Sequence, residues 1–251
     1  MTGRHANPDE HPQAGRHGLS TPGVRVLLAV TAVIVLVFLL VPAAPGPRVH
    51  PESWGCQNNL RQLAVALINY ESTRGEFPPA YTVDDAGNRL HSWRSLLLPY
   101  LDRPDLCERI DFKKPWDDPV NAEVLAAMPE VYRCPGLPGS VDASMTTYCV
   151  VVGPEFVFKG ADGTRVDDLL DGANETLLVV EVSSDHAVQW MSPEDIDEQT
   201  ILQLLQNKKV THPGRLIAAY ADGRIESLPL ELQADELHDL LTIAGEKQDT
   251  E

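Results

Sequence analysis

Positive charge is scarce in this chain of 251 residues, in which 20 Lys and Arg stand against 37 Asp and Glu. From residue 44 onward the imbalance grows, with 17 basic against 35 acidic side chains. A region this acidic repels the phosphate backbone of nucleic acids and anionic lipid head groups, so we expect no nucleic-acid partner. A dispersed acidic surface of this kind mainly keeps a protein soluble.

The short motifs that carry common enzyme chemistry are also absent. The sequence contains no His-Glu-x-x-His zinc motif, no Gly-x-Ser-x-Gly nucleophile elbow and no glycine-rich phosphate loop. Ser183, His212 and Asp222 offer the residue types of a serine-hydrolase triad, but any chain of this length contains such triples. We therefore predict no catalytic residues, no metal site and no cofactor.

One acidic loop has a weak likeness to a calcium site. Asp84, Asp85 and Asn88 surround Gly87, but the spacing departs from Asp-x-Asp-x-Asp-Gly and no bidentate Glu follows at the required distance. A solvated hairpin turn is the favoured interpretation, and a calcium-stabilised domain is the alternative.

A run of apolar residues near the N-terminus is the strongest signal in the sequence. Val26–Val41 holds sixteen residues of which only Thr31 is polar, and a soluble helix of this length is seldom apolar on every face. We predict a transmembrane helix over residues 24–43, close to the roughly 20 residues that a bilayer requires. The basic residues precede it, so the positive-inside rule places the N-terminus in the cytoplasm. A cleaved signal peptide is the alternative, because Val41–Ala43 offers a small-residue cleavage pattern.

The composition divides the chain into five segments. A tail with no apolar pattern should be disordered, and the prolines after the apolar run should form a stiff spacer. The predicted segments are the cytoplasmic tail at 1–23, the transmembrane helix at 24–43, the spacer at 44–52, one folded domain at 53–230, and a C-terminal helix with an acidic tail at 231–251.

Apolar periodicity in the folded domain predicts helices first and strands later, which favours an α+β fold with a mainly antiparallel sheet. Leu60, Leu63 and Leu67 lie on one face of a helix expected over 52–73. Asp222–Gly223 suits a two-residue primed turn in a hairpin. The other predicted elements are a hairpin at 81–83 and 90–93, short helices within 95–110 and 118–128, strands at 148–152, 176–182, 215–221 and 224–228, and helices at 193–206 and 234–243.

Four cysteines, Cys56, Cys107, Cys134 and Cys149, all follow the apolar run. No pair has the Cys-x-x-Cys spacing of zinc or redox sites. Outside the cytoplasm an even number favours disulfides, and four cysteines allow three connectivities. We favour Cys56 with Cys134, since each flanks a break where the chain must be held. Four buried free thiols is the alternative.

His212 precedes a Pro-Gly turn and the strand predicted at 215–221. We predict a structural role for His212, in which its hydrogen bonds fix the start of the strand at one end of the hairpin. The turn at Asp222 and Gly223 closes the other end.

An ordered series of short motifs resembles a large bacterial family of prepilin-like proteins that carry a domain of unknown function. The series covers about residues 53 to 229 and ends with His212, nine further residues, and Asp222–Gly223. The other matching pieces are Cys56–Gln62, Ala66–Tyr70, Gly75–Pro79, Ser92–Arg94, Leu97–Leu101, Pro115–Asp117, Tyr132–Pro135, Tyr148–Gly153, Asp171–Thr176 and Val180–Glu181.

The resemblance implies a pilin-like architecture, in which an N-terminal hydrophobic helix leads into a head with an amphipathic helix packed on a mainly antiparallel sheet. Family members are similar to type IV pilins and to the pseudopilins of type II secretion, and no catalytic residues are established for them. This sequence departs from the family at its start, because Gly18–Gly23 replaces the usual peptidase site. No acidic residue lies between Arg25 and Glu52, so the glutamate that usually partners a neighbouring subunit is missing.

These observations lead to a functional hypothesis. We expect a non-enzymatic domain anchored in the cell membrane by lipid contacts of residues 24–43, with the C-terminal domain in the periplasm or otherwise outside the cytoplasm. Its partners would be envelope or pilin-like proteins. The alternatives are a processed pseudopilin subunit and, from another class, an extracytoplasmic hydrolase.

Overall fold

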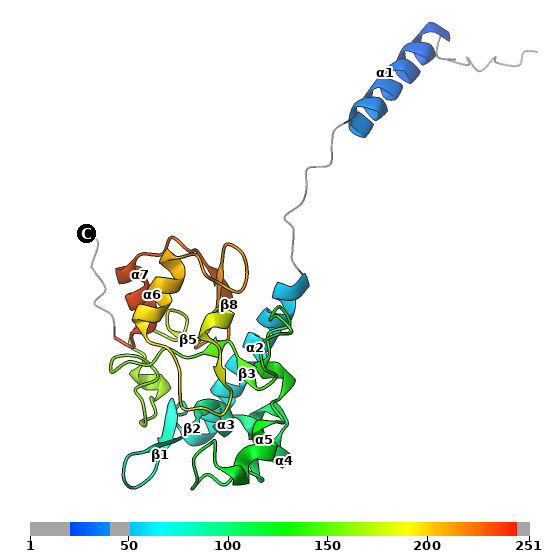
Figure 1. Cartoon of the computed structure of the whole chain (residues 1–251). Helices are drawn as coiled ribbons and strands as arrows, with labels where there is room; N and C mark the ends of the chain where they lie inside the picture. Colours follow the sequence, from blue (N-terminus) through cyan, green and yellow to red (C-terminus); the bar gives the residue numbers. More distant parts are fainter. Residues whose placement is uncertain (1–20, 41–50, 245–251) are drawn as a thin grey trace, which may run out of the picture. The chain divides into compact units, whose positions relative to one another are not determined.

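The structure is a computed structural model of the whole chain and describes residues 21–40 and 51–244. The chain divides into two units, Met1–Arg48 and Val49–Glu251, drawn in Figure 1. The predicted tail at 1–23 and spacer at 44–52 lie mostly outside the described residues, as do residues 41–43 of the predicted membrane segment.

The first unit contains one described helix, α1 (Thr21–Leu40). In the middle of this helix, the Thr31 hydroxyl donates to the carbonyl oxygens of Leu27 and Leu28 at 3.1 and 3.0 Å, so the helix backbone itself satisfies this group. Among the helices of residues 21–40 and 51–244, none combines the length and apolar character needed to cross a lipid bilayer.

The second unit is built around helix α2 (Pro51–Arg74), and its bounds agree closely with those of the helix predicted at 52–73. The predicted apolar face of Leu60, Leu63 and Leu67 is completely buried. Gly75 ends the helix with a positive φ of 83°, a conformation that glycine adopts without steric cost.

A four-stranded sheet lies against α2. Its strands β4 (Tyr148–Cys149), β5 (Leu177–Glu181), β7 (Leu216–Tyr220) and β8 (Ile225–Leu228) are antiparallel and follow the order β4-β5-β7-β8. The α+β class with a mainly antiparallel sheet is therefore confirmed.

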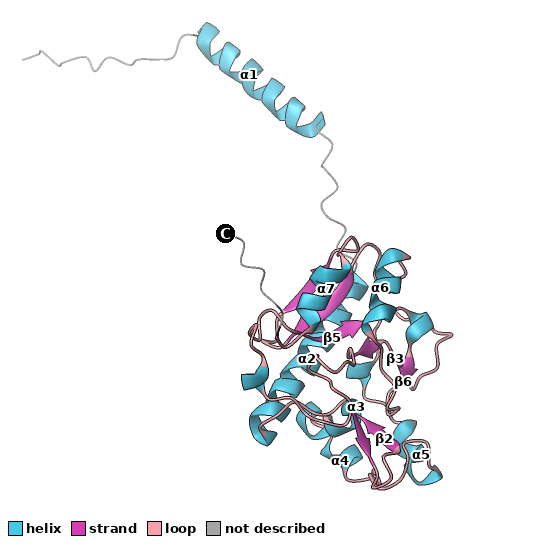
Figure 2. Cartoon of the chain, turned by 90° about the vertical axis from the view of Figure 1, so that its left-hand side faces the viewer, coloured by secondary structure: helices cyan, strands magenta, loops and turns pink. Residues whose placement is uncertain are grey.

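Both faces of this sheet are covered. Val179 and Ile217 point to the α2 side, whereas Val180 and Ala218 belong to a second core beneath α6 (Glu198–Gln206) and α7 (Ala234–Leu241). Figure 2 shows α6 and α7 near each other beside β5. Because successive strand residues alternate between two buried faces, β5 and β7 are apolar almost throughout.

Short elements surround the core, and prolines explain why they stay short. Pro99 and Pro104 stand in the first turns of separate helical pieces, as the sequence predicts, because proline cannot donate within a continuing helix. These elements are β1 (Tyr81–Val83), β2 (Arg89–Ser92), α3 (Trp93–Leu96), η1 (Leu98–Leu101), α4 (Pro104–Cys107), η2 (Pro119–Asn121), α5 (Ala122–Leu125), η3 (Glu130–Tyr132), β3 (Met145–Thr146), η4 (Val166–Asp168), η5 (Ser184–His186) and β6 (Val188–Gln189).

Two predicted elements are wrong in extent. The strand predicted at 148–152 ends at Cys149, and Val151 and Val152 make isolated bridges instead. The helix predicted from residue 193 begins at Glu198, because Asp197 caps it by accepting a hydrogen bond from the Thr200 amide at 2.8 Å.

The β7–β8 hairpin forms as predicted, but its turn is not the primed type. A type I′ turn needs positive φ at both central residues, and of Asp222 and Gly223 only Gly223 has one, at 87°. The Gly223 amide donates to Tyr220 O at 3.0 Å and the Tyr220 amide to Arg224 O at 2.9 Å. This is a three-residue loop that closes with a glycine bulge.

Candidate functional site

Four buried side chains of metal-binding types meet between α2 and the sheet. Cys56 lies on α2, Cys134 follows η3, Glu181 ends β5, and His212 lies in the loop before β7. One ligand-type atom from each lies within 4.8 Å of those of the others. We call these four residues the Cys–Glu–His cluster.

A disulfide joins the two cysteines, which are 78 positions apart in sequence and have their Cα atoms 5.1 Å apart. This is the pairing favoured from the sequence. It ties the first turns of α2 to the segment after η3, and both residues are buried. In the described chain Cys107 and Cys149 are free, and burial raises the pKa of the Cys149 thiol to about 12, which keeps it protonated at neutral pH.

Glu181 is the most constrained member of the cluster. It is 1% exposed and stands on the same face of β5 as Val179, so its carboxyl group points toward α2. Among the described residues, neither carboxyl oxygen accepts a well-directed hydrogen bond. Burial raises the pKa of Glu181, and the nearby His212 ring acts in the opposite direction.

His212 links this carboxyl group to the disulfide. Its Nε2 atom lies 3.2 Å from Glu181 Oε2 and 3.8 Å from Cys134 Sγ. Its backbone carbonyl accepts a hydrogen bond from the Arg215 amide at 3.2 Å. The backbone thus closes the turn that the sequence predicts, while the ring faces the cluster.

Neighbouring hydrogen bonds hold the cluster in place. Thr211 donates to Val182 O at 2.6 Å, which fixes the His212 loop to the end of β5. Asn59, one turn beyond Cys56 on α2, donates its side-chain amide to Arg133 O at 2.8 Å. Cys134 lines a cavity of about 390 Å³ together with Asn59, Met128, Glu130, Arg133, Pro135, Leu137 and Ala143.

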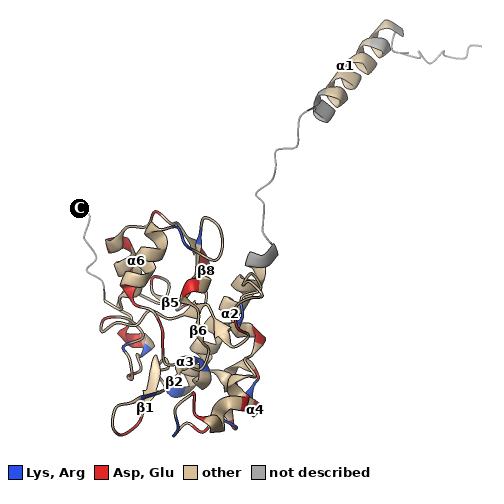
Figure 3. Ribbon diagram, viewed as in Figure 1, with Lys and Arg blue, Asp and Glu red and all other residues tan. Residues whose placement is uncertain are grey.

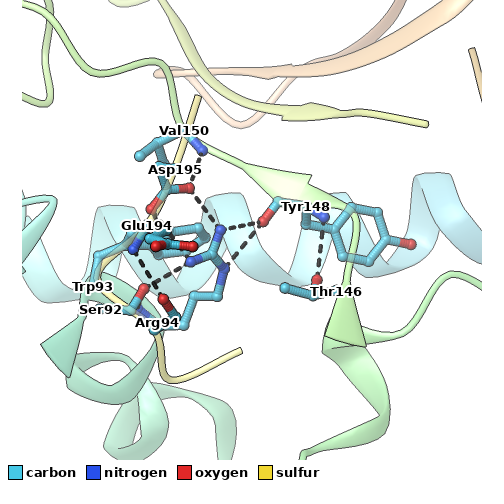
Figure 4. A network of polar contacts seen from close by, with 9 residues as sticks. Ser92, Trp93, Arg94, Thr146, Tyr148, Val150, Glu194 and Asp195 are labelled. Atoms are coloured by element: carbon cyan, nitrogen blue, oxygen red, sulfur yellow. Dashed lines mark hydrogen bonds and ion pairs between the residues drawn. The ribbon is translucent and has the colours of Figure 1, made fainter. Parts of the chain in front are cut away.

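A second buried polar network lies beside β4, as Figure 4 shows. Arg94 and Asp195 form an ion pair with side chains 0% and 1% exposed, and Arg94 Nη2 lies 2.6 Å from Asp195 Oδ1. Arg94 also donates to Tyr148 O and Ser92 Oγ, at 2.8 and 2.7 Å.

Asp195 is equally well supplied with donors. It accepts from Trp93 Nε1 at 3.1 Å and from the Val150 amide at 2.9 Å. Burial raises the pKa of Asp195, while Arg94 and these donors lower it. Because the polar atoms are paired with one another, this network joins segments of the fold and leaves little capacity for a ligand.

Asp195 also lines a cavity of about 560 Å³. Arg89, Glu194 and His186 contribute charged or titratable groups to its wall. The guanidinium of Arg89 already stacks on the Tyr81 ring, 4.1 Å from its centroid.

Ser183, His212 and Asp222, the residue types of a serine-hydrolase triad, have different partners in the structure. Ser183 Oγ lies 3.1 Å from Nδ1 of His186. Asp222 accepts from the Arg224 amide at 2.9 Å in the hairpin turn, and His212 faces the Cys–Glu–His cluster. The signature residues His212 and Asp222–Gly223 therefore lie at opposite ends of β7.

The candidate calcium loop forms an ordinary hairpin turn. Asp84 Oδ1 accepts from the amides of Ala86 and Asn88 at 2.9 and 2.8 Å, and Oδ2 accepts from the Asn88 side chain at 2.8 Å. These bonds lower the pKa of Asp84, with the Asn88 side chain as the main cause.

Sequence reasoning missed the meeting of Glu181 with His212 and the Arg94–Asp195 pair. A signal for Glu181 exists, because it is the single charged residue ending the apolar run Leu177–Glu181. Such a residue is buried only where a specific partner or ligand compensates for its charge.

A family model described as "Protein of unknown function (DUF1559)" matches residues 54–226. The chain belongs to this family. All four residues of the Cys–Glu–His cluster fall within the matched range of the DUF1559 domain, as do Arg94 and Asp195. No curated protein and no solved structure matches the chain.

Proposed function

We propose that this DUF1559 protein is a non-enzymatic, membrane-anchored domain outside the cytoplasm, with a structural or interaction role in the cell envelope. The observation that carries the proposal is the buried Cys56–Cys134 disulfide. Structural disulfides form and persist in oxidising compartments and are rare in the reducing cytosol.

The N-terminal residues support the anchor. Val26–Val41 is apolar except for Thr31, and basic residues precede it, as expected for a segment whose N-terminal side stays in the cytoplasm. The net negative charge of the folded part is compatible with a domain that stands away from anionic lipid. In Figure 3 the Asp and Glu positions, coloured red, are scattered along several helices and loops of the Val49–Glu251 unit.

A pilin-like relationship is supported by the packing of α2. Its fully buried face, including Leu60 and Leu67, lies against β5 and β7 of an antiparallel sheet, as expected for a pilin-like head. Partners would be other envelope proteins or pilin-like subunits. N-terminal sequencing of the mature chain separates the two forms of the proposal, since a processed pseudopilin would begin near Leu19 and a permanent anchor would not.

A non-enzymatic role is supported by how the polar groups are used. Arg94 and Asp195 pair with each other and with neighbouring polar groups in the interior, and the Ser183 hydroxyl lies 3.1 Å from Nδ1 of His186. Catalytic groups, in contrast, must converge on a space that a substrate can occupy.

Membrane fractionation tests the anchor. We expect the full-length chain to resist alkaline carbonate extraction and its C-terminal domain to be digested when protease is added to spheroplasts. Ile34→Arg places a charge near the middle of the apolar run, which costs about 2.5–3.5 kcal/mol for insertion, and should shift the chain to the soluble fraction. Thr31→Ala is the matched control and should remain in the membrane. A wild-type chain that is carbonate-soluble and protected from protease contradicts the proposal.

A further inference from the structure

The four ligand atoms of the Cys–Glu–His cluster lie within 4.8 Å of one another, and two distances from His212 are close to those of a tetrahedral zinc site. Zinc binds sulfur at about 2.3 Å and nitrogen or oxygen at about 2.0–2.1 Å, so its ligand atoms lie roughly 3.3 to 3.8 Å apart. His212 Nε2 lies 3.2 Å from Glu181 Oε2 and 3.8 Å from Cys134 Sγ. Two sulfurs, one imidazole nitrogen and one carboxylate oxygen form a donor set that suits zinc above magnesium or calcium.

Glu181 supplies independent support for a bound cation. Its side chain is 1% exposed, and both carboxyl oxygens lack a well-directed hydrogen-bond donor among the described residues. A buried carboxylate without donors is costly unless a cation or a proton compensates for its charge. The Arg94–Asp195 pair meets this requirement with four donors on the carboxylate, from Arg94, Trp93 and Val150. Glu181 has no comparable set.

The disulfide occupies the position of the two sulfur ligands. Bonded sulfurs cannot act as thiolates, so the oxidised chain presents only Glu181 and His212. Reduction adds two electrons and two protons and yields the thiols of Cys56 and Cys134. Both residues are held by backbone elements, α2 and the segment after η3, so their sulfurs stay beside the other two ligands when the S–S bond breaks.

We propose that the Cys–Glu–His cluster is a two-state site, in which the reduced chain binds one Zn²⁺ through Cys56, Cys134, Glu181 and His212. The reductant is a dithiol or a phosphine. Zinc binding then displaces the two thiol protons, so that both sulfurs coordinate as thiolates. In the oxidised chain the disulfide holds α2 to the segment after η3. In the reduced chain the metal makes the same connection and also binds β5 and the His212 loop.

The proposal is tested on the purified full-length chain in detergent. Cys107→Ala/Cys149→Ala removes the two free thiols outside the cluster and is the working background. Reduced with tris(2-carboxyethyl)phosphine and dialysed against Zn²⁺, this chain should retain one zinc per molecule by mass spectrometry of the metal. With Co²⁺ it should give the intense visible bands of a tetrahedral ion and a thiolate charge-transfer band. The same chain with its disulfide intact should give neither.

Substitutions of the two non-cysteine ligands distinguish this site from binding by two cysteines alone. Glu181→Gln and His212→Gln should each weaken zinc binding by more than the roughly 10- to 100-fold expected for loss of an outer-shell partner. Asp185→Asn, at an exposed acidic residue outside the cluster, should leave the affinity unchanged. Equal affinity in all three variants would overturn the proposal.

Folding of the reduced chain gives a second measurement. If reduction unfolds the chain, as followed by circular dichroism, Zn²⁺ should restore the folded signal. A reduced chain that keeps its native signal and binds no zinc, or that stays unfolded when zinc is added, would contradict the two-state site.

Discussion

Oε2 of Glu181 lies 3.2 Å from Nε2 of His212, which brings the last residue of β5 against the loop that leads into β7. In sequence the elements η5, β6 and α6 lie between these two residues, yet the antiparallel pairing of β5 and β7 returns the chain to the same end of the sheet. This contact and the adjacent disulfide make one buried polar cluster out of motifs that lie far apart in the sequence.

The disulfide should contribute strongly to stability. A cross-link that spans 78 residues restricts the unfolded chain, which corresponds to about 4.5 kcal/mol in the loop-entropy model. We therefore expect Cys56→Ala/Cys134→Ala to lower the free energy of unfolding by about that amount in urea titrations. The matched variant Cys107→Ala, at a half-buried free cysteine, should lose much less. Equal losses would show that the cross-link itself adds little.

The Arg94–Asp195 pair should be sensitive to loss of one partner. Arg94→Met leaves Asp195 buried without its counter-charge, which should lower the free energy of unfolding by about 3–5 kcal/mol. The comparison is Arg103→Met, whose pair with Asp105 is 36% and 61% exposed and should contribute less than about 1 kcal/mol. Chemical denaturation monitored by tryptophan fluorescence measures both. A small effect at Arg94 would mean that water reaches this network.

Glu181 should give the oxidised chain a characteristic pH dependence. Burial raises its pKa in the folded chain above the ordinary value of 4.5, so the unfolded chain releases this proton at lower pH than the folded chain does. The free energy of unfolding should therefore fall as the pH rises from about 4.5 toward the folded pKa. His212 and Tyr148 face the same group and are unchanged in the comparison.

The test compares wild type with Glu181→Gln across that pH range. As the pH rises from about 4.5, the free energy of unfolding of the wild type should fall relative to that of Glu181→Gln, because glutamine cannot titrate. Parallel pH profiles for the two chains would show that Glu181 is ionised in the folded chain as readily as in the unfolded one.

The hairpin turn provides a test of local geometry. Gly223 has a φ of 87°, and a side chain there adopts a left-handed conformation that costs about 1–2 kcal/mol. Gly223→Ala should therefore lower the free energy of unfolding by that amount. Gly139→Ala is the control, since its added methyl group meets nothing within 4 Å and its φ is not in the left-handed region. Equal stability of the two variants would contradict the assignment of a glycine bulge.

Several parts of the fold could be predicted from the sequence because local chemistry determines them. The spacing of Leu60, Leu63 and Leu67 specifies a helix with one buried face, and α2 follows it closely. The Asp222–Gly223 pair correctly marks a hairpin. The turn type was wrong because dipeptide preference does not reveal which of the two residues has positive φ.

The rest depends on contacts between distant segments. The sequence predicts a helix from residue 193, yet residues 193–197 are not helical. Asp195 instead pairs with Arg94, which lies about a hundred residues earlier in the chain. Likewise nothing local to Glu181 indicates that His212 and Cys134 will lie beside it. A buried charge at the end of an apolar strand was the available sign, and its partner emerges only when β5 and β7 pair.

The redox state of Cys56 and Cys134 in living cells tests the central claim most directly. Cells producing the Cys107→Ala/Cys149→Ala chain are quenched in acid, free thiols are blocked with N-ethylmaleimide, and the extract is reduced and labelled with a polyethylene-glycol maleimide. We expect two labels per chain after reduction and none without it, all in the membrane fraction. A chain recovered from the cytosol whose two thiols react with N-ethylmaleimide before reduction would contradict an extracytoplasmic, disulfide-bonded domain.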